Sequence, residues 1–346
     1  MKLFIKIFAV MLALALVAGG LYLHTGYRTG VNTIGSVKND ANTTTFLAVG
    51  DIMLSRDVAA QMEQHNKDGL YPFANILGLL SSTDFNFANL ESPFSGTDEQ
   101  DPDPNTFTFN APTYALRGLV KNNFKVLNLA NNHAMNQGKD GVMFTKKYLL
   151  ENDILGIGTG ANAEEAWQGG VYTAGNGTKI GFAGATYGPN TEYLAQTSDL
   201  DHLKETVARL KMQSDFVVVT MHAGEEYTRE PTAAQTKFAQ AAIDDGADIV
   251  IGAHPHWIQP FEKYKGKYIF YSLGNFVFDQ SWSQDTKEGL TLKITLDKTA
   301  KQVVLKQIEL VPVIIEHNSQ PRLATEAEQK SIFKKIGATT NVITPQ

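Results

Sequence analysis

Short apolar runs alternate with longer amphipathic segments from residue 45 onward, and this alternation predicts the fold. The runs expected to form strands are Phe46–Val49, Phe85–Ala88, Val126–Leu129, Ile180–Ala183, Phe216–Thr220, Ile249–Ile251 and Tyr268–Tyr271. The segments expected to form helices are 57–67, 113–122, 139–151, 201–213 and 232–245. Strands that alternate with helices in this way predict an α/β fold in which helices cover the sheet.

The segments at either end of this pattern differ from it in composition. Towards the C-terminus, the runs Leu290–Leu296 and Val303–Val311 predict a closing hairpin of strands. Residues 318–346 are polar, and we expect the last ten of them to be disordered. Residues 24–44 are rich in Gly, Thr, Asn and Ser and predict a flexible stem. The expected domain therefore spans residues 45–317.

The N-terminus predicts a membrane anchor. Lys2 and Lys6 precede an apolar run from Ile7 to Leu23, which as a helix reaches roughly 26 Å against a bilayer core of about 30 Å. Positive charge before the run predicts a cytoplasmic N-terminus and an extracytoplasmic domain. An uncleaved signal anchor over residues 1–23 fits the run better than a cleaved signal peptide, because Ala18-Gly19-Gly20 is a weak cleavage site. We therefore expect a single-pass protein of the cell membrane.

The overall composition excludes several classes of function. The formal net charge is −6, which argues against broad binding of nucleic acid or another polyanion. An acidic substrate would have to be recognised locally, for instance at a bound metal. The chain has no cysteine, which excludes disulfides, thiolate zinc sites, a cysteine nucleophile and a lipidated cysteine.

A short polar cluster directly follows six of the expected strands. The clusters are Gly50-Asp51, Asn89-Leu90-Glu91, Asn131-Asn132-His133, His222-Ala223-Gly224-Glu225, Gly252-Ala253-His254-Pro255-His256 and Ser272-Leu273-Gly274-Asn275. Ligands of open α/β sheets bind beyond the carboxyl ends of the strands, so six such clusters should converge on one place. Imidazoles with carboxylate and amide oxygens suit Mn, Fe or Zn ions better than Ca or Mg ions.

The spacing of two histidines suggests a dinuclear centre. His254 and His256 are separated by one residue, so on a turning segment their side chains can point in different directions and serve two adjacent metals. Two metals bridged by a carboxylate can polarise a phosphoryl or carbonyl oxygen and generate a hydroxide nucleophile. Each residue taken alone also has a plain structural explanation: Asp51 as a helix cap, Glu91 as a solvated acid and His222 as a core histidine.

The clusters also resemble the ordered blocks of a known superfamily. Gly50-Asp51, Asn131-Asn132-His133, His222 and the Gly252–His256 segment resemble the calcineurin-like metallophosphoesterases. The set GDIML, ANLESP, LANNHAMNQG, HAGEEY, GAHPHWIQP and YSLGNFVFDQ is similar to the CapA/PgsA family of poly-γ-glutamate capsule proteins, from about Phe46 to Gln280. This resemblance implies a metallophosphoesterase-like layered β-sheet sandwich flanked by helices.

The resemblance also implies roles for individual residues. The implied ligands of two divalent metal ions are Asp51, Glu91, Asn132, His222, His254 and His256. Among them, Glu91 stands where the superfamily has its bridging carboxylate. His133 resembles the residue that protonates the leaving group, and Glu225 belongs to the CapA-like block as a metal ligand or proton carrier.

Two positions depart from the superfamily pattern. Met53 stands where the superfamily has a histidine ligand, and a thioether is a poor ligand for hard divalent ions, although Met is common there in the CapA-like proteins. Ala134 stands where the superfamily often has an acid, so we expect His133 to lack that orienting partner. Both departures argue against efficient phosphoesterase chemistry.

Three functions follow from these observations. The resemblance implies a component of poly-γ-glutamate synthesis and export that contacts the membrane, the anionic polymer and membrane subunits of a polymer synthase. The clustered ligands indicate a metal-dependent hydrolase of phosphoesters or γ-glutamyl amide bonds. The two departures suggest instead a non-catalytic polymer-binding module. We favour the first as the biological role, and it excludes neither of the others.

Overall fold

The computed structural model describes residues 41–101, 103 and 105–345. The expected anchor, residues 1–23, lies outside the described residues, as does the expected stem up to residue 40. The last stem residues, Thr43 and Thr44, already belong to the first strand. Within the described part of the chain, no helix combines the length and apolar character needed to cross a membrane.

The first of two β-sheets has nine strands in the order β14-β13-β12-β1-β2-β3-β4, with β11 beside β1 and β15 beside β13. Strands β1 to β4 run parallel, whereas β12, β13 and β14 add to them antiparallel. The bounds are β1 (Thr43–Ile52), β2 (Phe85–Leu90), β3 (Phe124–Asn128), β4 (Leu155–Ile157), β11 (Asn275–Val277), β12 (Glu288–Lys298), β13 (Val303–Glu316), β14 (Gln320–Leu323) and β15 (Val342–Ile343).

The second sheet has six strands in the order β5-β6-β7-β8-β10-β9. Its centre, from β6 to β10, is parallel, and β5 and β9 are antiparallel edge strands. The bounds are β5 (Gly170–Thr173), β6 (Lys179–Thr186), β7 (Phe216–His222), β8 (Ile249–Ala253), β9 (Phe261–Tyr264) and β10 (Lys267–Phe270). All seven strands expected from the apolar runs are therefore present, as are both strands of the closing hairpin.

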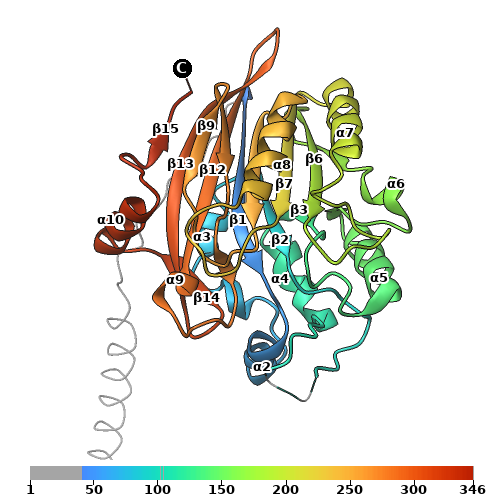
Figure 1. The fold of residues 1–346 in the computed structure, drawn as a ribbon. Helices are drawn as coiled ribbons and strands as arrows, with labels where there is room; N and C mark the ends of the chain where they lie inside the picture. Colours follow the sequence, from blue (N-terminus) through green and yellow to red (C-terminus); the bar gives the residue numbers. More distant parts are fainter. Residues whose placement is uncertain (1–40, 102, 104, 346) are drawn as a thin grey trace, which may run out of the picture. The chain divides into compact units, whose positions relative to one another are not determined.

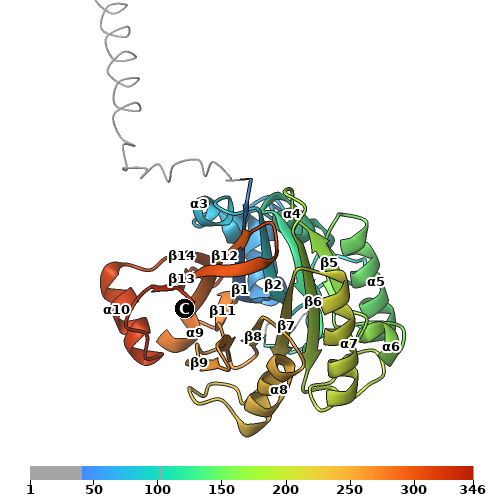
Figure 2. The same ribbon diagram turned by 90° about the horizontal axis from the view of Figure 1, so that it is seen from above.

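The two sheets pack face to face through aromatic side chains. The ring of Phe182 on β6 lies 6.3 Å from the rings of Phe46 and Phe85 and 5.5 Å from that of Phe87. All four rings are fully or almost fully buried, and burying a Phe side chain stabilises a fold by about 1.5–3 kcal/mol. Figure 2 shows the two sheets side by side, viewed from above.

Helices cover the outer face of each sheet (Figures 1 and 2). One core cluster joins the first sheet to its helices, and another joins the second sheet to α7 and α8. The helices are α2 (Arg56–Gln64), α3 (Leu77–Leu80), α4 (Leu116–Lys121), α5 (Gly138–Leu150), α6 (Ala163–Ala166), α7 (Leu200–Gln213), α8 (Ala233–Asp244), α9 (Gln284–Lys287) and α10 (Glu326–Lys335), with 3₁₀ turns at Tyr71–Phe73 and Thr113–Ala115. The expected α/β sandwich flanked by helices is thus what the described residues form.

The C-terminal segment is more ordered than its polar composition suggests. Strand β14, helix α10 and strand β15 all lie after residue 317, and β15 pairs with β13 through Ile343 and Ile308. Ile332 of α10 is fully buried against the same core. The expectation that the last ten residues are disordered is therefore wrong for residues 337–345, the part of that stretch that the structure describes. Single apolar residues spaced among polar ones gain their stability only from tertiary contacts, which the local pattern does not reveal.

Candidate metal centre

Four parallel strands from the two sheets deliver polar side chains to one edge of the sandwich. Asp51 is the penultimate residue of β1 and is paired in register with Asn89 of β2. His222 ends β7 beside Ala253, the last residue of β8. Because the sheets face each other, the carboxyl ends of β1 and β2 meet those of β7 and β8.

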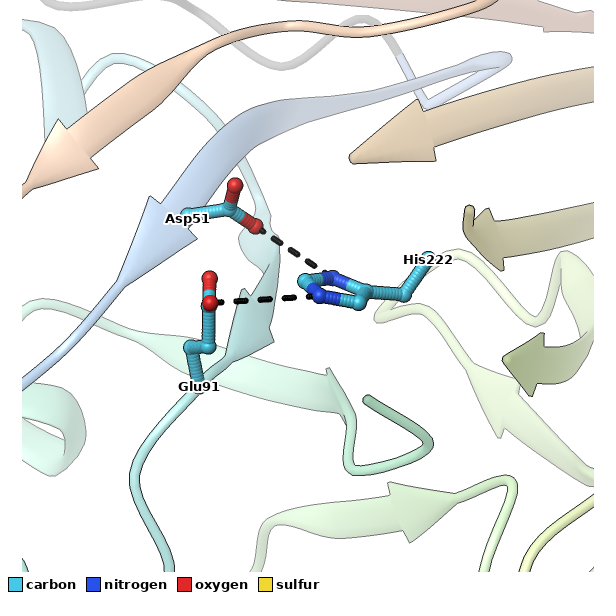
Figure 3. Close-up of side chains that lie close together, drawn as sticks. All are labelled: Asp51, Glu91 and His222. Carbon is cyan, nitrogen blue, oxygen red and sulfur yellow. Dashed lines mark ion pairs between the residues drawn. The ribbon is translucent and has the colours of Figure 1, made fainter. Parts of the chain in front are cut away.

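The fully buried side chains of Asp51, Glu91 and His222 lie at the centre of this site (Figure 3). His222 Nδ1 lies 3.7 Å from Asp51 Oδ1, and His222 Nε2 lies 3.9 Å from Glu91 Oε1. One ligand atom from each residue lies within 4.8 Å of the others. The two carboxylates point at the imidazole from neighbouring strands of the first sheet, whereas the imidazole comes from the second sheet.

The histidines that follow β8 turn into the same place. His254 Nδ1 lies 3.2 Å from His222 Nε2. His256 lies 3.5 Å from Asp51 through Nδ1 and 3.7 Å from Glu91 through Nε2. Both His254 and His256 have positive φ, 99° and 57°, a conformation that costs a non-glycine residue about 1–3 kcal/mol. With this left-handed backbone, the side chains of both residues enter a single pocket.

Asn132 and His133, which follow β3, complete the cluster. Asn132 Oδ1 lies 2.8 Å from His222 Nε2, and His133 Nε2 lies 3.9 Å from Glu91 Oε1. The structure therefore brings together all six predicted metal ligands and His133. Glu91 Oε1 is central to them, within 3.9 Å of an imidazole nitrogen of His133, His222 and His256.

Unpartnered polar atoms at the centre fit a divalent cation. In the described part of the chain, both carboxylate oxygens of Glu91 and Nδ1 of His222 are buried without a hydrogen-bond partner. Each such atom costs about 1–3 kcal/mol when nothing satisfies it. Burial, and then the charges of Asp51 and Glu226, hold the pKa of the Glu91 carboxyl well above its ordinary value. A cation among these atoms would satisfy them and favour the ionised carboxyl, so the donor set fits a divalent metal.

Burial favours the neutral form of His133, His222 and His254, which suits these rings to ligation. Burial lowers the pKa of His254 to about 3 and that of His133 to about 4, and it holds the pKa of His222 well below its ordinary value. The positive charge that a second histidine would carry lowers these pKa values further. Neutral imidazoles keep the ring lone pair that a metal requires.

A layer of asparagines holds the ligands, and the sequence analysis assigned none of them this role. Asn89 Nδ2 donates to Asp51 Oδ1 at 2.8 Å, and Asn128 Nδ2 donates to Asn89 Oδ1 at 2.9 Å. Asn275 Oδ1 lies 2.8 Å from His256 Nδ1, so this ring nitrogen carries the proton and Nε2 is free to bind a metal. Their positions in the sequence could have indicated this role. Asn89 and Asn128 lie at the ends of β2 and β3, and Asn275 begins β11 beside β1.

His133 has an orienting partner after all. His133 Nδ1 lies 2.9 Å from Asn136 Oδ1 and 3.1 Å from the carbonyl oxygen of Phe107. The Phe109 N–H donates to the same Asn136 oxygen, so both neighbours are acceptors and the proton lies on Nδ1. His133 therefore lacks the acid partner, as Ala134 predicts, but Asn136, two positions further along, orients the ring in its place.

Two other predicted positions lie outside the cluster. Met53 is fully buried in the hydrophobic core, and its sulfur accepts from the Ser55 N–H, so it does not join the ligands. Glu225 is exposed, and among the described residues its side chain has no hydrogen bond or ion pair. Its neighbour Glu226 is the acid whose charge acts on Glu91. A catalytic role for Glu225 stays a prediction.

Comparison with known proteins identifies the family of this chain. Residues 45–280 match the family described as bacterial capsule synthesis protein PGA_cap. The chain belongs to this family. The matched PGA_cap region contains every predicted ligand and His133, and the resemblance to CapA-like proteins is confirmed.

Curated relatives cover most of the chain. It is 32% identical over 311 residues to the capsule biosynthesis protein CapA of Bacillus anthracis, a match that spans 86% of this chain and 74% of that one. It is 30% identical over 301 residues to the PGA biosynthesis protein CapA of Bacillus subtilis (strain 168), spanning 85% and 77%. Among solved structures, a putative 5'-nucleotidase from Staphylococcus aureus aligns with a TM-score of 0.46 and 16% identity over 85% of this chain and 58% of that one.

Proposed function

We propose that this chain acts in the synthesis or export of poly-γ-glutamate, as a metal-dependent protein on the outer side of the cell membrane. Membership of the PGA_cap family supports this role, as does the similarity to two capsule or PGA biosynthesis proteins whose matches cover most of the chain. The partners in this proposal are the anionic polymer and membrane subunits of a polymer synthase. The apolar run after Lys2 and Lys6 supports a single-pass anchor over residues 1–23.

The observation that carries the proposal is the buried convergence of unpartnered ligand atoms at Asp51, Glu91 and His222. We assign two divalent ions of the Mn, Fe or Zn class to this centre in a metallophosphoesterase-like arrangement. The assigned ligands are Asp51, Glu91, Asn132, His222, His254 and His256. The central place of Glu91 Oε1 among the imidazoles supports a bridging role. Bound divalent ions polarise a phosphoryl or carbonyl oxygen and activate water.

A specific observation favours hydrolytic chemistry over simple polymer binding. His133 Nε2 faces the centre while Asn136 and the Phe107 carbonyl hold Nδ1. At neutral pH the ring is uncharged, so Nε2 is a proton acceptor at the edge of the metal site. A metal centre with a proton acceptor beside it is suited to the hydrolysis of a phosphoester or a γ-glutamyl amide bond.

Metal analysis together with a genetic test distinguishes the role in polymer synthesis from the dependence on a metal. The purified full chain should retain Mn, Fe or Zn, and His222→Ala should lose it. His202→Ala is the matched control, because His202 is half-exposed on α7 and is hydrogen-bonded to Asp199 away from the centre. In a strain lacking the gene, wild type and His202→Ala should restore surface polymer, whereas His222→Ala should not.

Metal content and surface polymer test different parts of the proposal, so each can be refuted without the other. Polymer levels that do not change when the gene is deleted would refute the role in poly-γ-glutamate synthesis, whatever the metal content. A His222→Ala protein that is folded, metal-free and fully able to restore polymer would refute metal dependence while leaving the pathway in place. Turnover of a γ-glutamyl oligomer or a phosphodiester that His133→Ala does not reduce would contradict the hydrolytic proposal.

A further inference from the structure

A cleft of about 690 Å³ opens beside the metal centre. Helix α2 forms one wall, and Trp282 and its neighbours form another. The region around Phe107 and Tyr114 closes a third side. The proposed function assigns no ligand to this cleft.

The cleft adjoins the metal centre through a short chain of contacts. Tyr227 and Gln280 line the cleft, and Gln280 Nε2 donates to Tyr227 Oη at 3.2 Å. Asn275 Nδ2 donates to Gln280 Oε1 at 3.1 Å, and Asn275 Oδ1 contacts His256. The Tyr227 ring also stacks 5.8 Å from the ring of His256. A ligand held in the cleft would therefore lie one side chain away from a proposed metal ligand.

The charges along the cleft are predominantly negative. The carboxylates that line it are Asp57, Glu63, Asp98, Asp101 and Asp279, and the cationic side chains are Arg56 and Lys67. Arg56 is engaged by Asp279 in a nearly buried ion pair. Lys67 lies 3.9 Å from Asp98. Within the described residues, Asp57 and Glu63 of α2 and also Asp101 have no cationic partner, so the cleft keeps a net negative charge.

Exposed aromatic rings lie among these carboxylates. Trp282 is 62% exposed and Phe107 is 70% exposed, values that are unusual for such large apolar side chains. Trp282 packs edge-on against Tyr227 with 4.8 Å between ring centroids, which holds the ring at the cleft wall. The face of an aromatic ring attracts cations, and most strongly when the ring is Trp. The Arg56 guanidinium already lies 5.9 Å from the centroid of the Phe107 ring. The carboxylates together with the exposed Trp282 ring are therefore the part of the cleft that is complementary to an organic cation.

We propose that this cleft binds a ligand through a primary ammonium group, such as the amine of an amino acid, peptide or amino sugar, and holds it next to the metal centre. The interior of a polyanionic chain is repelled here, because Asp57 and Glu63 remain unneutralised. Ammonium binding needs neither a bound metal nor the polymer. It therefore stands independently of the proposed function.

A binding measurement on the full chain in mild detergent tests the proposal. The probes are 1,5-diaminopentane, its uncharged analogue 1,5-pentanediol and an N-acetylated γ-glutamyl oligomer, which has no ammonium group, each titrated by calorimetry. The diamine should bind saturably and more weakly as salt rises, and the diol should not bind. Trp282→Ala and Glu63→Gln should each weaken diamine binding about threefold to fivefold, as the loss of one exposed cation–π or ionic contact does.

A control variant separates the cleft from general surface charge. Glu205→Gln removes the same charge from an exposed position on α7, and it should leave diamine binding unchanged. Equal weakening by Glu205→Gln would overturn the proposal, as would diamine binding that Trp282→Ala and Glu63→Gln do not alter. Binding of the diol or the γ-glutamyl oligomer as tightly as the diamine, or no saturable diamine binding, would overturn it too. Metal content measured on the same samples shows separately whether the metal centre is intact.

Discussion

Replacing Gly50 by alanine should damage the fold and the metal centre together. Gly50 precedes Asp51 in β1, and a Cβ built at this position would lie 1.9 Å from the carbonyl oxygen of Gly274. Ordinary van der Waals contact begins near 3.4 Å, so β1 and the Gly274 backbone must separate by roughly 1.5 Å. The Asp51 N–H donates to the same oxygen at 3.0 Å, so the bond that aligns Asp51 with Asn275 is lost as well.

The size of the effect follows from these two losses. Overpacking of a tight interior costs about 1–3 kcal/mol, and loss of a backbone hydrogen bond costs about 1 kcal/mol. The free energy of unfolding should therefore fall by about 2–4 kcal/mol for Gly50→Ala. Metal affinity should fall at least about tenfold, because metal–ligand distances tolerate deviations of only about 0.2 Å.

Urea denaturation and metal analysis on the same samples measure both quantities. Gly78→Ala is the matched control, since a Cβ at Gly78 in α3 meets no atom within 4 Å. That substitution should raise the free energy of unfolding by about 0.4–1 kcal/mol without changing metal affinity. A Gly50→Ala protein with wild-type stability and metal content would refute the idea that the closeness of β1 and β11 sets the ligand geometry.

Three further substitutions test other parts of the structure. Asn275→Ala should lower metal affinity about 10- to 100-fold, as loss of a partner that orients a ligating histidine does, because it frees His256 Nδ1. Arg322 lowers the pKa of the Glu328 carboxyl to about 2 from an ordinary 4.5, so the stabilisation is full above pH 4.5 and is lost as the pH falls towards 2. The pair is partly exposed, so Glu328→Gln should lower the free energy of unfolding by less than about 1 kcal/mol at pH 7, and by still less at pH 3. Thr232→Ala removes the capping box of α8 and should cost about 1 kcal/mol in thermal or urea denaturation.

Each of these predictions has a result that contradicts it. Unchanged metal affinity in Asn275→Ala would show that the amide does not orient the ligand. An equal loss of stability at pH 3 and pH 7 in Glu328→Gln would exclude an ionic contribution from that pair. Thr232→Ser, which keeps the capping oxygen, should remain close to wild type, and a loss equal to that of Thr232→Ala would point to packing of the threonine methyl group.

The sequence by itself predicted seven strands, the closing hairpin, five of the helical segments and the polar residues that gather at the candidate metal centre. Apolar runs such as Phe216–Thr220 must be buried, and this requirement is local, so the pattern predicts it directly. The polar clusters after the strands stood out because they interrupt that pattern. For this reason Asp51, Glu91 and His222 could be selected before any coordinates were known.

Tertiary structure alone decided how these side chains meet and what supports them. The packing of one sheet on the other brings His254 to within hydrogen-bonding range of Asp51, 203 positions away, and no local pattern encodes that distance. The same holds for Asn136, which orients His133, for the cleft beside the site and for β15 at the C-terminus. Burial of an apolar run depends on the run itself, whereas ligation depends on separate segments lying a few ångströms apart, and only the packed sheets set that separation.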